Sequence, residues 1–285
     1  MKDHRSEFAV EKMCNAFKVG KSGFYDWLNR KPSKRAEQRE VLSMEIHRLH
    51  AQSKGRYGSP KITIELRDRG VSVSRPRVAR IMKANGIRSV IAGKFKVRTT
   101  DSNHGFRISP NILDRNFSPT GPSKSWVSDI TYIGTGEGWL YLTTIMDLYD
   151  RKIIGWSMST TMHAGKTVVP AWKMAQINRP FCTGLVFHSD RGVQYACKEF
   201  RDKLNPEKVS QSMSRKGNCW DNAVAENFFK ILKSETGYRK YGSIKQAEQE
   251  LFEFIEIWYN RIRRHSALGY LSPEQFGKGK NKIAA

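Results

Sequence analysis

Two aspartates in this chain stand where carboxylate chemistry could occur. Asp129 lies in a segment rich in Val, Ile, Thr, Tyr and Trp, which predicts a strand and puts the side chain on an apolar face. A carboxylate on an apolar face is energetically costly unless it is paired or binds a metal. The alternative is that Asp129 lies at an irregular strand end and has no functional role. Asp190 ends an apolar run, at the carboxyl end of a predicted buried strand, where ligand sites gather in open α/β sheets. An Asx-turn is the alternative for Asp190.

A third carboxylate, Glu226, lies on a predicted helix. Asn222, Lys230 and Lys233 share its stripe, because residues four and seven positions apart project the same way. A solvated face with one ion pair also explains this stripe. A second stripe is apolar and should face a core: Trp220, Val224, Phe228, Ile231 and Leu232.

The spacing of the three carboxylates resembles that of a known family. Between Asp190 and Glu226 lie 35 residues, as in DDE transposases and retroviral integrases. The resemblance is closer to the OrfB-type transposases of the insertion-sequence 3 family and covers nearly the whole chain. The stretches that carry it are WVSDITYI, GWLYLTTIMDLYDRKIIGW, HSDRGVQYA, SMSRKGNCWDNAVAENFFKILKSE and HSALGYLSPEQF.

The resemblance implies that Asp129, Asp190 and Glu226 are the catalytic residues and the metal ligands. Oxygen donors without Cys or His suit two Mg²⁺ ions, or Mn²⁺ in their place, and a cation relieves the repulsion among the carboxylates. Asp129 would bridge both ions, Asp190 would hold one and Glu226 the other. Water would cut the element end, and the freed 3′-hydroxyl would attack a second phosphodiester.

Several side chains are expected beside this site. Lys230 and Lys233 would hold the DNA backbone near the scissile bond, with Asn222 and Arg191 as further neighbours. Three other acidic residues are weaker ligand candidates by spacing and motif context: Asp147, Asp150 and Asp221.

The composition points to a polyanionic partner. The formal charge is +23, and the first 100 residues hold 24 Lys and Arg against 9 Asp and Glu. The four scattered cysteines favour reduced thiols over a zinc site. No apolar run is long enough to span a bilayer and no signal peptide is evident, so we expect a cytoplasmic, nucleoid-associated bacterial protein without a membrane partner.

The chain divides into five predicted parts. They are a helix-turn-helix-like segment (1–35), a helix-turn-helix DNA-binding domain (36–90), an extended linker along DNA or a partner subunit (91–123), the catalytic domain (124–276) and a disordered tail (277–285). In the second part, a helix over 36–53 should turn Val41, Ile46 and Leu49 inward. Ser74 should cap a later helix that presents four basic residues to DNA: Arg75, Arg77, Arg80 and Lys83.

The predicted element order of the catalytic domain is three strands, then helix, strand, helix, strand, helix. The second helix is expected over 194–204 and a long helix should open at the capping box of Ser243. This order resembles the RNase H-like integrase core, an α/β fold with a mixed sheet flanked by helices, here preceded by an all-α region.

The family resemblance also implies partners. Relatives act on the terminal inverted repeats of their element and on target DNA, by copy-out-paste-in transposition. Joining two ends requires at least a homodimer on DNA. Such transposases are often frameshift fusions with an upstream OrfA product that carries a leucine zipper; no such heptad run occurs here, so this chain would be the downstream half. Two alternatives stay open: a non-catalytic DNA-binding regulator, and an RNase H-type nuclease.

Overall fold

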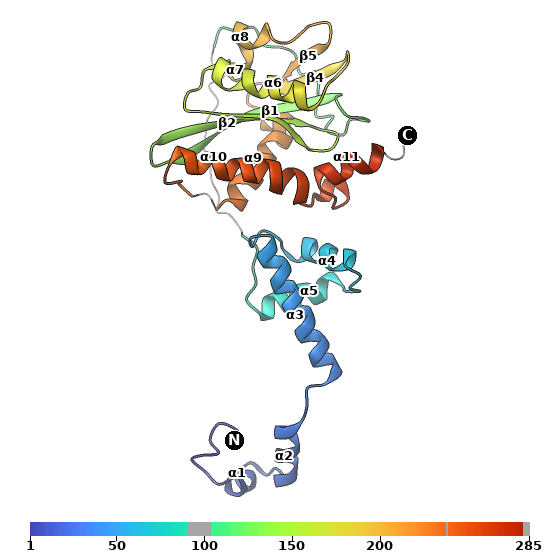
Figure 1. Ribbon diagram of the computed structural model, residues 1–285, viewed down its shortest axis with the longest axis vertical. Coiled ribbons are helices and arrows are strands. Elements are labelled where there is room, and N and C mark those ends of the chain that lie inside the picture. The colour runs from blue at the N-terminus through green and yellow to red at the C-terminus, as the bar shows by residue number, and fades with distance from the viewer. Residues whose placement is uncertain (91–103, 238, 282–285) are drawn as a thin grey trace. The chain divides into compact units, whose positions relative to one another are not determined.

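A computed structural model describes residues 1–90, 104–237 and 239–281 and divides the chain into two compact units, Met1–Ser89 and Val90–Ala285 (Figure 1). Each unit is built from its own core. Residues 91–103 of the expected linker lie outside the described residues. No helix among those described is long and apolar enough to cross a membrane.

The first unit is all-helical. Its helices are α1 (Val10–Phe17), α2 (Lys21–Asn29), α3 (Lys34–Gln52), α4 (Ser59–Asp68) and α5 (Arg75–Ala84). The last three share a core of buried aliphatic side chains: Ile46, Leu49, Ile62, Leu66, Val78 and Ile81. Ser74 caps α5 as predicted, because its side chain accepts the Arg77 N–H. The inward placement of Val41 is wrong: Val41 is 62% exposed, and Leu42 is the buried residue of that turn.

The second unit is built on a mixed sheet of order β3-β2-β1-β4-β5. The strands are β1 (Ser125–Thr135), β2 (Gly138–Asp147), β3 (Ile153–Ser159), β4 (Leu185–Ser189) and β5 (Val209–Met213). β1, β2 and β3 pair antiparallel, whereas β4 runs parallel to β1 and to β5. This topology confirms the predicted fold class.

Helices cover both faces of the sheet (Figure 1). On one face lie η1 (Ala164–Lys166), α6 (Val168–Asn178), α7 (Val193–Ala196) and α8 (Lys198–Arg201). An aromatic core joins them to the sheet, with Trp126, Trp172, Phe187 and Phe200 all at most 1% exposed. On the other face lie α9 (Ala223–Glu235), α10 (Ile244–Phe252), the π-helix η3 (Glu253–Ile262) and α11 (Pro273–Asn281). Short 3₁₀ turns precede α9 (η2, Cys219–Asn222) and α11 (η4, Ser266–Leu268).

Three local expectations differ from the structure. The helix expected over 194–204 is two short helices, because the backbone at Cys197 is extended between α7 and α8. The described part of the linker packs on the sheet: the backbone N–H groups of Ile112 and Leu113 both donate to the Ser212 hydroxyl, and Leu113 is 4% exposed. The region expected to be disordered from 277 is helical to Asn281, because Phe276 anchors α11 against the Tyr149 ring; residues 282–285 lie outside the described residues.

Candidate active site

Asp129 and Asp190 come from neighbouring parallel strands. The register of β1 and β4 pairs Val127 with His188. Two residues further along, in the same direction, each strand reaches its aspartate. Burial, and next the negative charge of Asp190, raise the pKa of Asp129 well above its usual range. The topology therefore brings the two carboxylates to one edge of the sheet.

Backbone N–H groups orient both aspartates. The Asp190 carboxylate accepts a hydrogen bond from Gly192 at 2.9 Å, which is the Asx-turn that its sequence context left open. A Cβ atom on Gly192 would lie 3.0 Å from the same Asp190 oxygen, so a larger residue there would have to displace the Asp190 carboxylate slightly. The Asp129 carboxylate accepts from the N–H of Ile130 at 2.8 Å. A backbone N–H one or two residues away thus orients each carboxylate.

Glu226 reaches this edge from the first turn of α9. Burial and then the negative charge of Asp190 raise the pKa of Glu226, so these two carboxylates also lie within electrostatic range. The start of α9 is tied to β1, because the Asn222 side-chain amide donates to the carbonyl oxygen of Ser128 at 3.2 Å. Asn222 is 3% exposed, and its own carbonyl oxygen has no hydrogen-bond partner among the described residues. Asn222 thus positions α9 beside Asp129.

The expected cationic neighbours differ in their placement. Lys233 is half-buried, and its positive charge acts to lower the pKa of Asp129, so it lies beside that carboxylate. Lys230 is exposed, one turn earlier on α9. The Arg191 guanidinium donates to the backbone oxygen of Ser214 at 2.6 Å, and this bond ties the loop after β4 to the end of β5.

The three weaker ligand candidates are held by arginines. Arg179 lies 2.8 Å from Asp147 and 2.6 Å from Asp150, and both carboxylates are buried. Asp221 is fully buried and lies 2.9 Å from Arg115 and 2.7 Å from Arg215. These pairs satisfy the carboxylates within the protein, which gives each a structural role.

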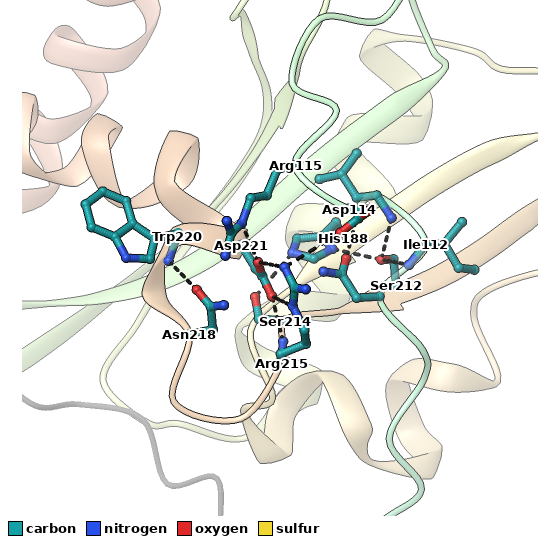
Figure 2. Close-up of polar contacts among 12 residues, drawn as sticks. Ile112, Asp114, Arg115, His188, Ser212, Ser214, Arg215, Asn218, Trp220 and Asp221 are labelled. Atoms are coloured by element: carbon teal, nitrogen blue, oxygen red, sulfur yellow. Dashed lines mark hydrogen bonds and ion pairs between the residues drawn. The ribbon is translucent and has the colours of Figure 1, made fainter.

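Figure 2 shows that the Asp221 cluster organises the loop before α9. Arg115 reaches Asp221 from the segment that precedes β1, and Arg215 donates from both its backbone and its side chain. Nearby, His188 lies between the hydroxyls of Ser212 and Ser214, at 2.8 and 3.2 Å. Burial lowers the pKa of His188 to about 4, so this histidine is neutral and structural at physiological pH.

A basic groove of about 590 Å³ lies between α3 and α5 in the first unit. Arg77 and Arg80 line it, as the sequence suggested, whereas Arg75 and Lys83 are exposed on the same helix without lining it. Its other wall is formed by α3 side chains that sequence analysis did not single out: Arg35, Gln38 and Arg39. None of the described residues that line the groove is acidic, so its chemistry suits phosphate oxygens.

The donor set at the sheet edge fits a hard divalent cation. All three groups are carboxylates, and burial first, then the negative charge of Asp190, raises the pKa values of Asp129 and Glu226. Among the residues that the structure describes, no group of three or more His, Cys, Asp or Glu side chains is already arranged tightly enough to hold a metal ion.

Comparisons with known proteins agree with this architecture. Two models described as integrase core domain match residues 119–219 and 207–273, and one described as HTH-like domain matches residues 37–95. A 31 kDa protein of insertion element IS600 from Shigella sonnei is 39% identical over 274 residues, which cover 96% of this chain and all of the relative. The transposase InsF of insertion sequence IS3A from Escherichia coli K12 is 38% identical, covering 96% of this chain and 95% of the relative. Among solved structures, a simian T-cell lymphotropic virus intasome in complex with a PP2A regulatory subunit aligns over 81% of this chain and 73% of that one, at 13% identity and a TM-score of 0.46.

The fold and the matched core define a polynucleotidyl transferase of the integrase class, with a DNA-binding helix-turn-helix region. The extent and level of sequence identity to the two insertion-element relatives identify the family within this class. The chain belongs to the insertion-sequence 3 family of transposases, and its function is DNA transposition. The predicted resemblance is thereby confirmed.

Proposed function

We propose that Asp129, Asp190 and Glu226 are the catalytic carboxylates of this transposase. The observation that carries the proposal is the placement of Asp129 within β1 and of Asp190 just after β4, each two residues beyond a paired position of these parallel strands, with Glu226 within electrostatic range. The three alternative acids, Asp147, Asp150 and Asp221, are buried and paired with arginine. The convergence of three carboxylates from β1, from the residue after β4 and from α9 favours an enzyme over a regulator with an inactive core, because clustered like charges are costly and are retained where they bind a cation.

The three carboxylates would hold two Mg²⁺ ions, for which Mn²⁺ could substitute. When bound, such ions lower the pKa of a water molecule and stabilise the leaving oxygen of a phosphodiester. The chain's own groups position the DNA. Lys233 lies beside Asp129 and Lys230 lies one turn away at the surface, so both can contact backbone phosphates near the scissile bond.

The reaction sequence comprises two displacements at phosphorus. Hydrolysis at the element end frees a 3′-hydroxyl, whose oxygen then attacks a second phosphodiester and releases that strand's own 3′-oxygen. Within the family, these steps serve copy-out-paste-in transposition through a circular intermediate. The basic groove between α3 and α5 would hold the terminal inverted repeat.

We further propose the assembly. Joining two ends requires two active sites on one DNA complex, so the active form is at least a dimer on DNA. An upstream OrfA-type product, separate or fused, would supply the zipper that this chain lacks in sequence. Because its substrate would be DNA, the transposase would act in the bacterial cytoplasm, at the nucleoid.

A joining assay separates a transposase from an RNase H-type nuclease. The full chain is mixed with Mg²⁺ and duplex DNA that carries the element's own terminal repeat, labelled on the transferred strand. A transposase yields both the cut strand and a longer, joined product. Cleavage without any joined product, in the presence of target DNA and of the upstream partner, would show a nuclease instead.

A further inference from the structure

A pocket of about 550 Å³ lies along the second half of β1, beyond the residues that pair with β4, in the second unit. The pairing of β4 with β1 ends at Val127, and a bridge from Tyr241 reaches the same strand at Thr135. Tyr241 is fixed there by backbone hydrogen bonds of 3.0 Å to Gly134 and 2.8 Å from Gly136. Between these two attachments no described strand pairs with this side of β1, and Asp129 and the pocket-lining residues Tyr132 to Thr135 lie along it.

The pocket lining combines aromatic and basic side chains. Trp139 and Tyr132 meet edge to face, with ring centroids 6.1 Å apart and an angle of 88°. Trp139 is 58% exposed although its indole is large and apolar. Lys233 and Lys240 supply positive charge, Arg239 is ion-paired with Glu250, and no acidic residue is among the described residues that line the pocket. Such a lining suits a ligand with a flat π-face and an anionic group.

The pocket adjoins the carboxylates. Lys233 lines the pocket and also lies within electrostatic range of Asp129. Tyr132 lines the pocket too, and the negative charge of Asp190, after burial and the neighbouring Tyr141, contributes to raising the pKa of Tyr132. A strand held at the carboxylates therefore has its next nucleotides within reach of the pocket.

We propose that this pocket binds one nucleotide of the DNA strand beside the scissile phosphate, with the base turned out of the duplex and stacked on Trp139. Lys233 and Lys240 hold the adjoining phosphates. The volume falls in the range of pockets that take a small organic ligand, which includes a nucleotide. Stacking on an aromatic ring accepts any base, so the pocket distorts the strand without reading its sequence. The inference rests on the proposed function, since it requires DNA at the carboxylates.

Photo-crosslinking tests the pocket directly. The full-length Glu226→Gln chain is bound to duplexes of the element end that carry 5-iodouracil singly at each of the three positions on either side of the cut. The crosslinked peptide is identified by mass spectrometry. We expect one position to crosslink to Trp139 or Tyr132. DNA that binds but crosslinks to neither residue from any position overturns the inference.

A comparison of joining rates among variants is the second test of the pocket. Trp139→Ala should slow joining roughly 10-fold or more, Trp139→Phe should recover most of the rate, and Phe252→Ala, an exposed aromatic away from the pocket, should leave it unchanged. An abasic site at the crosslinked position should slow wild type equally and add nothing to Trp139→Ala.

The two proposals fail separately. If wild type cuts and joins, no crosslink forms at the pocket and Trp139→Ala matches Phe252→Ala, the pocket inference alone is wrong. If the crosslink forms on Trp139 but wild type neither cuts nor joins, the proposed reaction is wrong and the pocket stands as a nucleotide-binding site.

Discussion

The side-chain amide of Asn222 donates a hydrogen bond to the backbone oxygen of Ser128, at 3.2 Å, and so joins the start of α9 to the strand residue that precedes Asp129. Asn222 is the N-cap residue of α9, and Glu226 lies in the first turn of that helix. This single bond links two of the proposed catalytic carboxylates through the backbone, although about a hundred residues separate them in sequence.

Asn222→Ala should therefore reduce turnover without removing a carboxylate. Loss of an interaction that orients metal ligands typically costs about 10- to 100-fold in metal affinity or activity. We expect a higher Mg²⁺ requirement for joining, with DNA affinity unchanged. Asn218→Ala is the matched control, because Asn218 only caps the neighbouring 3₁₀ turn. An unchanged Mg²⁺ titration in Asn222→Ala would show that the bond positions nothing.

The Asp221 cluster should matter for stability. Asp221→Asn leaves the guanidinium groups of Arg115 and Arg215 without their buried carboxylate, which should cost about 1–3 kcal/mol. Denaturant unfolding of the full chain measures the loss. Asp114→Asn is the control: Asp114 is exposed and lies 3.6 Å from Arg215, so the change should cost at most about 1 kcal/mol. Equal losses for the two variants would contradict the structural role of Asp221.

The same cluster should make stability fall in acid. Hydrogen bonds from Arg215 hold the pKa of Asp221 well below its usual range. A carboxylate with a depressed folded-state pKa stabilises the fold above its unfolded pKa of about 3.9 and loses that contribution as the pH falls below it. Wild type should therefore lose stability more steeply below about pH 4 than Asp221→Asn does. Parallel acid-unfolding curves would exclude this source of pH dependence.

The groove between α3 and α5 should contribute to DNA affinity. Arg35→Ala with Arg39→Ala removes two cations from its α3 wall. Each lost phosphate contact should reduce the slope of log affinity against log salt by about 0.9. Arg48→Ala with Arg69→Ala removes the same charge elsewhere, from residues paired with Glu45, and should change the slope less. Equal slopes in both double variants would mean that only net charge matters.

Local sequence patterns predicted the elements of the site well. The apolar run before Asp190, the β-rich segment around Asp129 and the helical spacing after Asn222 each define one element, and the structure forms all three. Ser74 and Ser243 cap their helices as expected, because capping depends on residues within one turn.

Features that depend on packing or helix phase were missed. Arg39 and Arg77 share a groove only because α3 packs on α5, and no periodicity connects them. Trp220 was expected in the core, yet it is 68% exposed. It lies in the 3₁₀ turn η2, which ends before α9 begins at Ala223, so the helical stripe does not extend back to Trp220.

The central claim is that Asp129, Asp190 and Glu226 together perform the reaction. The direct test is single-turnover cleavage and joining of the element's own end in Mg²⁺, with Asp129→Asn, Asp190→Asn and Glu226→Gln compared with wild type. Glu248→Gln, an exposed acid on α10, is the control. Each of the three variants should bind DNA as wild type does and lose at least about 100-fold in both steps, while the control stays active. A variant of any of the three that cuts and joins at the wild-type rate would contradict the assignment of that residue.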